Sequence, residues 1–311
     1  MKHLAPLFFA LTLTLVACGD DENEYKIGGG KGVVTPVDPD PRQDNGPEIA
    51  KYSLEFPALK GGKSEVIVHE AIINSTTQKK AVNYSLEWDH DKKATRWVCY
   101  KMYNAINASV WNRKNWGSDP WAYDPLVPSN EQQATYSELS KTKPVLANSD
   151  YYQRGHILAS ADRLSSKEAN EQTFYMTNIY PMVPNFNEAI WANMESRVRS
   201  WAGQADTLFV CKGGTIDKDS DILDRTIGNH IVPKYFYMAL LSKAGSKLKA
   251  MAFFIQHQDY SSWSALKNYA VNIAELQNKT GVDFFCNLPD DIENEIENVN
   301  KTQLLKDWNL N

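Results

Sequence analysis

The sequence predicts an α+β fold in which helices flank a central, largely antiparallel sheet. β-Rich or alternating runs dominate the chain after residue 50, whereas only residues 187–204 and 262–281 have the clear apolar periodicity of helices. Strands and helices alternate only loosely, which does not fit repeated strand–helix–strand units with a parallel sheet. The predicted strands are residues 52–56, 64–73, 82–88, 95–103, 173–182, 206–214, 235–242 and 249–257.

Residues 1–17 have the pattern of a lipoprotein signal peptide. Lys2 precedes an apolar run, residues 4–17, that is too short for a confident membrane span. Its end, Leu15-Val16-Ala17-Cys18, resembles the bacterial lipobox, in which the cysteine is lipidated and becomes the new N-terminus. We therefore expect a chain held at the membrane only by a lipid on Cys18, in a Gram-negative cell envelope, on the periplasmic or the surface face of the outer membrane. An ordinary secretion signal and an unprocessed anchor helix are the alternatives.

Residues 18–50 are expected to form a flexible acidic tether after the lipidated cysteine. This segment is rich in Gly, Pro and Asp and has little that could pack. Eight acidic and three basic residues between positions 19 and 50 place a charge of −5 on the tether. Residues 51–311 contain no repeat and no second linker, so we expect them to form one nearly neutral domain. That balance neither supports nor excludes a groove for nucleic acid.

Three cysteines remain in the expected domain: Cys99, Cys211 and Cys286. They allow at most one disulfide, in any of three pairings. Each lies in an apolar run, which favours buried thiols. The absence of Cys-x-x-Cys spacing removes the usual signature of a zinc site.

His156 lies in the stretch YYQRGHILASADRL, residues 151–164. Gly155 before it has no Cβ, so backbone or a ligand can approach closely. A lone histidine in such a run is more often structural than catalytic, because short motifs have many false matches. The catalytic interpretation gains support from residues 177–202, which begin with a polar turn and continue into a predicted helix.

That predicted helix carries a stripe of polar and aromatic residues. The stripe consists of Asn187, Trp191, Glu195 and Arg199, each four residues after the last. A purely buried face would not carry Asn, Glu and Arg together, whereas a solvated face would not need Trp191. The stripe is therefore a candidate for a functional site.

The combined motifs closely resemble those of the DNA/RNA non-specific endonucleases of the ββα-metal, or His-Me finger, type. The matching residues are Arg154-Gly155-His156, Asn178-Ile179-Tyr180-Pro181, and Asn187, Trp191, Glu195 and Arg199 at four-residue steps. Residues 232–241 and 280–289 are similar to a later core strand and the C-terminal segment of that family. The resemblance covers about residues 52–290, and it implies that residues 51–311 form a ββα-metal nuclease domain acting on DNA and RNA.

The resemblance implies a general base and a metal ligand. His156 would be the general base, since a neutral imidazole can take a proton from water near neutral pH. Asn187 would hold one hydrated Mg²⁺, with Mn²⁺ as an alternative, through its amide oxygen, because Mg²⁺ prefers oxygen ligands and keeps its waters. The ion would stabilise charge on the leaving 3′ oxygen.

Glu195 and Arg199 would complete the catalytic set. Glu195 lies eight residues after Asn187, or roughly 12 Å along an α-helix, so we expect it to hold a water of the ion rather than the ion itself. Arg199, one turn further, is expected to pair with Glu195 or to reach a phosphate.

Several supporting residues follow from the same resemblance. The family has an arginine that faces the scissile phosphate ahead of an Asp-Pro, and Arg113 occupies that place, with Lys114 as a competitor and an ordinary loop charge as the alternative. Asn178 is expected to support the water shell or the turn. Gln153 stands where the family usually has Asp, and the missing carboxylate puts metal affinity and rate in doubt rather than the reaction type.

Trp97, Trp111, Trp116 and Trp121 surround the Arg113 segment in sequence and could stack on bases. Buried anchors are the favoured interpretation of these tryptophans.

Two other functions remain open at this level: an envelope protein that binds nucleic acid or a partner without cutting, and a phosphodiesterase for small substrates.

Overall fold

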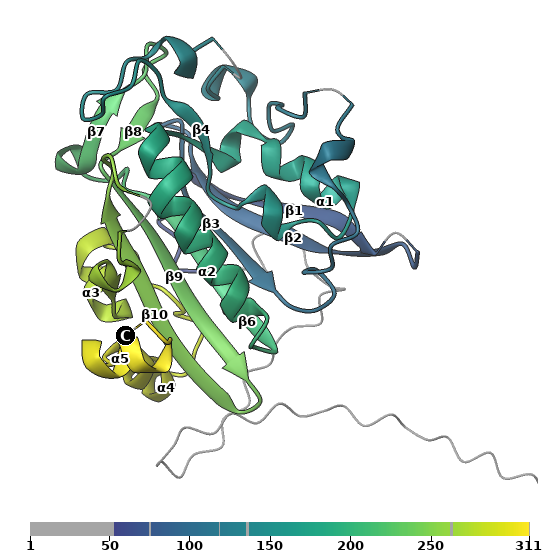
Figure 1. Cartoon of the computed structure of the whole chain (residues 1–311), viewed down its shortest axis with the longest axis vertical. Helices are drawn as coiled ribbons and strands as arrows, with labels where there is room; N and C mark the ends of the chain where they lie inside the picture. Colours follow the sequence, from purple (N-terminus) through teal and green to yellow (C-terminus); the bar gives the residue numbers. More distant parts are fainter. Residues whose placement is uncertain (1–52, 75, 118, 135–136, 262–263, 311) are drawn as a thin grey trace, which may run out of the picture.

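The computed structural model describes residues 53–310 except residues 75, 118, 135, 136, 262 and 263 (Figure 1). The predictions for residues 1–50, including the lipid on Cys18, lie outside the described residues. No helix in the described part of the chain is both long and apolar enough to cross a membrane.

A seven-stranded sheet with the order β1-β2-β3-β6-β9-β10-β11 forms the centre of the fold, and every neighbouring pair in it is antiparallel. Its strands are β1 (Ser64–Asn74), β2 (Lys79–Asp89), β3 (Ala94–Met102), β6 (Thr207–Gly214), β9 (Tyr235–Ala244), β10 (Lys247–Gln256) and β11 (Ala270–Val271). Two small antiparallel pairs accompany it: β4 (Gln153–His156) with β5 (Ile179–Met182), and β7 (Ile222–Arg225) with β8 (Ile231–Pro233). The predicted antiparallel α+β fold is confirmed.

Helices cover both faces of the sheet (Figure 1). They are α1 (Lys167–Glu171), α2 (Ala192–Ala202), α3 (Ile273–Thr280), α4 (Asp290–Glu297) and α5 (Lys301–Asp307). Helices α2 and α5 contribute to the apolar core on one face, and α3 and α4 contribute to the core on the other. Successive side chains of a strand point to opposite faces, so Met238 of β9 joins the first core and Tyr237 the second.

The helix predicted over residues 187–204 begins differently from the expectation. Phe186–Trp191 forms a π-helix, and regular α-helix begins only with α2 at Ala192. The prediction of a stripe with four-residue spacing was based on α-helical geometry over its whole length. The first turn is instead a π-helical turn, which is wider than an α-helical one. Such π-segments often occur at functional sites.

The predicted helix over residues 262–281 is wrong in its first half. Ala270–Val271 forms β11 and pairs with β10, because this apolar pair completes the sheet edge. Helix α3 starts only after Asn272, whose side chain accepts a hydrogen bond from Glu275 N, and it ends at Gly281, which has a φ of 72°.

Two predicted strands also need correction. Residues 53–56 form no strand: Leu54 and Phe56 are buried, but the chain turns there, with Phe56 N donating to Ser53 O. Of residues 173–182, only β5 is a strand, since two 3₁₀ turns precede it. In both cases apolar residues reach the core without a sheet partner.

The three cysteines are free thiols, and no disulfide joins them. Cys99 of β3 lies opposite Cys211 of β6, and both are buried as expected. Cys286 is only half-buried.

Candidate active site

Strands β4 and β5 hold the predicted motif in a fixed register. Gly155 lies opposite Tyr180, and His156 lies opposite Ile179. A Cβ on Gly155 would overlap the side chain of Met182. The glycine is therefore required by close packing between the two strands.

His156 sits in an aromatic pocket. Its ring centroid lies 5.2 Å from that of Trp121 and 5.1 Å from that of Phe174. The backbone oxygen of His156 accepts a hydrogen bond from Nε1 of Trp191 at 2.9 Å. Nε2 of the imidazole is inaccessible and has no hydrogen-bond partner among the described residues. This nitrogen is therefore a buried polar atom whose hydrogen-bonding capacity is unsatisfied, and a ligand reaches it only if the surrounding side chains move.

The imidazole of His156 is held in its neutral form. Burial, assisted by the positive charges of Arg113 and Arg154 and opposed by Asp162, lowers the pKa of His156 to about 3. A neutral imidazole has a free lone pair, and that of His156 stays unprotonated over the whole physiological pH range.

Residues of the predicted helix stripe contact the segment that contains His156 at several successive positions. Nδ2 of Asn187 donates to Oε1 of Gln153 at 2.8 Å, and Trp191 bonds to His156. Further along, Nη1 of Arg199 lies 2.8 Å from Oδ1 of Asp162. The structure therefore brings the predicted helix residues and the 153–162 segment together.

The expected pairing of Arg199 with Glu195 is not observed. Nη1 of Arg199 donates to Oδ1 of the buried Asp162 carboxylate instead. Burial raises the pKa of Glu195 to about 7, and Lys212 is the strongest of the neighbouring charges that oppose this. The separation expected between Glu195 and the ion remains a prediction.

Gln153, which replaces the expected Asp, bridges two residues of the π-helix. Besides accepting from Asn187, it donates through Nε2 to a carboxylate oxygen of Glu188. A carboxylate is thus present beside Asn187 although position 153 carries none. Glu188 was not predicted as a site residue.

Arg113 and Arg154 are held over aromatic rings around His156. The guanidinium carbon of Arg113 lies 5.6 Å from the centroid of Phe174, and that of Arg154 lies 4.6 Å from Trp121. The side chain of Lys114 has no ion pair or ring contact among the described residues. This arrangement favours Arg113 over Lys114 as the cation near the site.

Asn178 supports the turn, one of its two expected roles. Its side chain accepts from Leu158 N and donates to the backbone oxygens of Leu158 and Thr173. The residue is fully buried, so these bonds fix the chain just after His156.

The four tryptophans near the Arg113 segment divide into two groups. Trp97 is buried in the core on the opposite face from α2. Trp111 packs edge-on against Trp116, while Trp116 and Trp121 pack against Phe174. Trp121 also lines a cavity of about 440 Å³, together with Tyr151, Gln153, Arg154 and Asn187 among others.

Two buried charges, Asp162 and Lys212, were missed by the sequence analysis. Oδ2 of Asp162 accepts from the hydroxyl of Tyr100 at 3.0 Å and lies 3.8 Å from Nζ of Lys212. Lys212 is the only charge in the apolar run LFVCKGG, and Asp162 stands beside Arg163 in the largely apolar run ILASADRL. A charge in such a run has to be paired or functional when it is buried, and this signal could have identified both.

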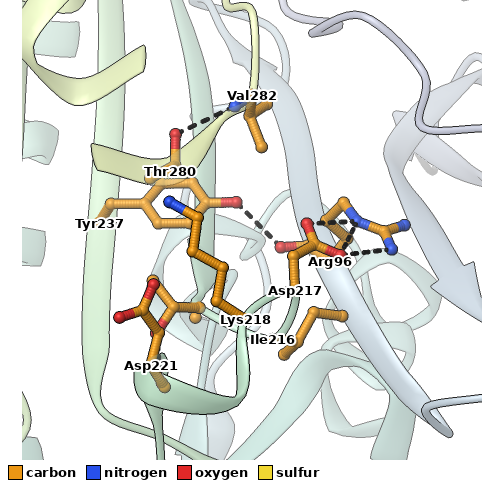
Figure 2. Close-up of a pocket in the computed structure, with 10 residues that line it drawn as sticks. Arg96, Ile216, Asp217, Lys218, Asp221, Tyr237, Thr280 and Val282 are labelled. Atoms are coloured by element: carbon orange, nitrogen blue, oxygen red, sulfur yellow. Dashed lines mark hydrogen bonds and ion pairs between the residues drawn. The ribbon is translucent and has the colours of Figure 1, made fainter. Parts of the chain in front are cut away.

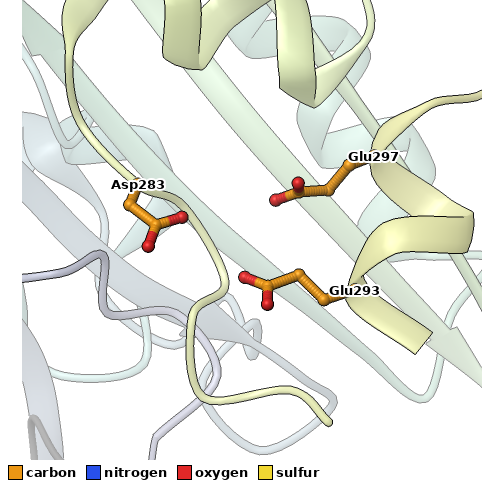
Figure 3. Close-up of side chains that lie close together, drawn as sticks. All are labelled: Asp283, Glu293 and Glu297. Atoms are coloured by element: carbon orange, nitrogen blue, oxygen red, sulfur yellow. The ribbon is translucent and has the colours of Figure 1, made fainter. Parts of the chain in front are cut away.

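Two other polar clusters among the described residues are less suited to catalysis. Figure 2 shows a small pocket where Arg96 pairs with Asp217; the cavity measures only about 10 Å³, enough for about one water. Figure 3 shows the carboxylates of Asp283, Glu293 and Glu297, with one oxygen of each within 4.8 Å of the others. Glu293 and Glu297 belong to α4, whose apolar residues pack on the sheet face opposite α2.

Comparisons with known proteins find similar nucleases. The sequence model of the family described as DNA/RNA non-specific endonuclease matches residues 64–291. A nuclease of Nostoc sp. is 28% identical over 227 residues, which cover 69% of this chain and 75% of that protein. A nuclease of Serratia marcescens is 25% identical over 68% of this chain and 75% of its own length.

Mitochondrial endonuclease G and its solved structure are also similar. The Bos taurus protein is 29% identical over 45% of this chain, and the match spans only 52% of that protein. A crystal structure of an EndoG/EndoGI complex shares the fold with a TM-score of 0.55 at 20% identity, covering 66% of this chain and 84% of that one. The predicted ββα-metal nuclease fold is therefore confirmed. Since the family match covers most of the chain, this protein belongs to the DNA/RNA non-specific endonuclease family.

Proposed function

We propose that this chain is a metal-dependent endonuclease that hydrolyses phosphodiester bonds in both DNA and RNA. The observation that carries the proposal is a neutral His156 whose Nε2 has no hydrogen-bond partner among the described residues, and whose backbone oxygen is bonded to Trp191 of the π-helix that also bears Asn187. Contacts to backbone phosphates, rather than to bases, would explain a lack of sequence preference.

His156 acts as the general base. Its Nε2 takes a proton from water, and the hydroxide so produced attacks phosphorus. The ring packing against Trp121 and Phe174 limits its rotation, and burial keeps it unprotonated until the substrate arrives. Proton transfer from water is therefore the specific task of this side chain.

The residues around Asn187 fit a hard divalent cation. The amide oxygen of Asn187 has no partner among the described residues, and the carboxylates of Glu188 and Glu195 add oxygen donors nearby in sequence. Such oxygen donors suit Mg²⁺ or Mn²⁺. A bound cation would supply charge stabilisation to the pentacovalent phosphorus and the leaving oxygen.

Cationic side chains around His156 orient the phosphate. Arg113 and Arg154 present guanidinium groups beside the His156 pocket, and a planar guanidinium matches two phosphate oxygens. Glu195 would accept hydrogen bonds from waters around the cation. Arg199 remains tied to Asp162, so its role is to hold the helix and to add positive potential.

The test is digestion of a supercoiled plasmid and a folded RNA by the purified protein with Mg²⁺, with Mn²⁺ and with EDTA. We expect cleavage of both substrates only with the cation, loss of cleavage in Asn187→Ala, and normal cleavage in the control Lys114→Ala. Binding without cleavage under every divalent ion would contradict an enzymatic function. Cleavage of a small chromogenic diester but not of DNA or RNA would show that the enzyme is a phosphodiesterase for small substrates.

We further propose that Cys18 carries a lipid that anchors the enzyme in a Gram-negative cell envelope. The sequence Leu15-Val16-Ala17-Cys18 after an apolar run supports this assignment. In cells fed a labelled fatty acid, the wild type should take up label and partition with membranes, while Cys18→Ser should do neither. Equal labelling of both would remove the assignment.

A further inference from the structure

Lys212 of β6 is a completely buried lysine beneath helix α2. Its side chain has 0% exposure, and Nζ has no hydrogen-bond partner among the described residues. The ammonium lies 5.4 Å from the ring centroid of Tyr100 and 5.9 Å from that of Trp191. A buried ammonium with three unused N–H groups is costly unless nearby charges compensate for it.

The compensating charges come from two other elements. Oδ2 of Asp162 lies 3.8 Å from Nζ, and the other oxygen of that carboxylate binds Arg199 of α2. Glu195 lies one turn after Trp191, whose ring centroid is 5.9 Å from Nζ, and one turn before Arg199, which binds Asp162; its carboxylate is the second one that interacts electrostatically with Lys212. Lys212 thus influences both Glu195, directly, and Arg199, through Asp162.

The need to fill space in the core does not explain why position 212 carries a lysine. Lys212 alternates with Leu208 and Val210 on the same face of β6, and both belong to the apolar core there. An apolar side chain would fill this position without a desolvation cost, and replacing buried charges by apolar residues often stabilises a protein. The charge at position 212 is therefore better explained by the carboxylates of the site than by packing.

We propose that Lys212 is a positioning residue. Its ammonium fixes the Asp162 carboxylate from the side of the sheet and holds the Glu195 carboxylate toward the cation and its waters. This inference rests on the proposed function, since it assigns Lys212 a task in the same site. Through Asp162, Lys212 also sets the position of the Arg199 guanidinium.

The main test compares Lys212→Met, which keeps an unbranched side chain only one heavy atom shorter, with Lys247→Met, a substitution of an exposed lysine of β10. Mn²⁺ binding to the substrate-free protein is measured by calorimetry, beside the Mg²⁺ dependence of plasmid cleavage. We expect Lys212→Met to weaken Mn²⁺ binding by about 10-fold or more, as loss of outer partners of a metal site does. Lys247→Met should bind Mn²⁺ as the wild type does.

A second variant separates positioning from fold stability. Asp162→Asn combined with Lys212→Met removes one charge of each sign, so it should fold even where Lys212→Met does not. If Lys212 acts on Glu195, the double variant binds Mn²⁺ more weakly than Asp162→Asn alone. Equal Mn²⁺ binding by these two variants would show that Lys212 only balances Asp162, and would overturn the inference.

The proposed function and this inference fail in different ways. A wild-type protein that neither binds Mn²⁺ nor cuts plasmid overturns both. A wild type that cuts, beside a Lys212→Met variant with normal Mn²⁺ binding and normal cleavage, overturns only the role of Lys212.

Discussion

The amide nitrogen of Asn187 donates a 2.8 Å hydrogen bond to Oε1 of Gln153, and Gln153 in turn donates to Glu188. The bond orients the Asn187 side chain so that its oxygen remains available for a cation. It also explains how Gln can stand in place of the expected Asp: the acceptor for Asn187 is kept, and Glu188 brings the negative charge.

Gln153→Asp is expected to lower the stability of the metal-free protein and to raise its affinity for the metal. The substitution removes the donor to Glu188 and sets two carboxylates together, so the metal-free protein should lose about 1 kcal/mol of unfolding free energy. The added charge should tighten Mn²⁺ binding by roughly 10-fold. Urea unfolding without metal and calorimetric Mn²⁺ titration measure the two effects.

The control for this variant is Gln153→Asp combined with Glu188→Gln. The amide now lies on position 188, so the metal-free stability should return toward that of the wild type. If Gln153→Asp alone leaves the metal-free stability unchanged, the bridge from Gln153 to Glu188 has no energetic importance.

Gly155→Ala should destabilise the β4–β5 pair. The new methyl group would overlap Met182, and overpacking of this kind costs about 1–3 kcal/mol. Thermal unfolding checks this, and Met182→Ala added to Gly155→Ala should recover part of the loss. A Gly155→Ala protein as stable as the wild type would show that the strands can separate at no cost.

The stability of the protein should fall as the pH drops below 6.5, partly because of His156. Its pKa in the folded state is lowered to about 3, mainly by burial, whereas an unfolded histidine has a pKa near 6.5. Below pH 6.5 the unfolded chain takes up a proton that the folded chain refuses, and the penalty grows until pH 3. His156 contributes no such penalty above pH 6.5.

His156→Gln should therefore reduce this acid sensitivity. Between pH 7 and pH 5 the wild type is expected to lose about 1–2 kcal/mol more unfolding free energy than His156→Gln. Urea unfolding at both pH values measures the difference. Identical losses in the two proteins would mean that His156 titrates normally in the folded state.

Arg113 and Lys114 are adjacent in sequence but should differ in effect. Arg113 lies over the ring that packs on His156, while the Lys114 side chain makes no such contact among the described residues. Arg113→Ala should lower kcat/KM for DNA about 100-fold, as loss of one transition-state donor does, whereas Lys114→Ala should stay near the wild type. The reverse result would assign the phosphate contact to Lys114.

Most of the sheet and the residues of the stripe could be predicted from local sequence, and the failures have identifiable physical reasons. Strands β1, β2, β3, β6, β9 and β10 are long and β-rich, so their own side chains signal them. Strand β4 was not predicted because Gln153–His156 has no alternating pattern and exists only through its pairing with β5. Residues 53–56 show the opposite case, in which an apolar pattern is buried without forming a strand.

In the candidate site, too, some residues could be predicted from local sequence, whereas their tertiary contacts could not. His156 and Asn187 could be named as candidates from their motifs, because their residue types suit a general base and a metal ligand. The partners could not: Arg199 binds Asp162 rather than Glu195, and Gln153 binds Glu188, because these contacts depend on how the π-helix and β4 meet in space. Lys212 reaches the site from a strand about 50 residues away from His156 in sequence.

The central claim, that His156 is the general base of a metal-dependent nuclease, is tested most directly by single-turnover cleavage of a labelled DNA with Mg²⁺, comparing the wild type with His156→Ala. Loss of a general base should slow cleavage by about 100-fold to 10,000-fold, with Mn²⁺ binding to the substrate-free protein unchanged, and added imidazole should restore part of the rate. Cleavage by His156→Ala at the wild-type rate would contradict the account.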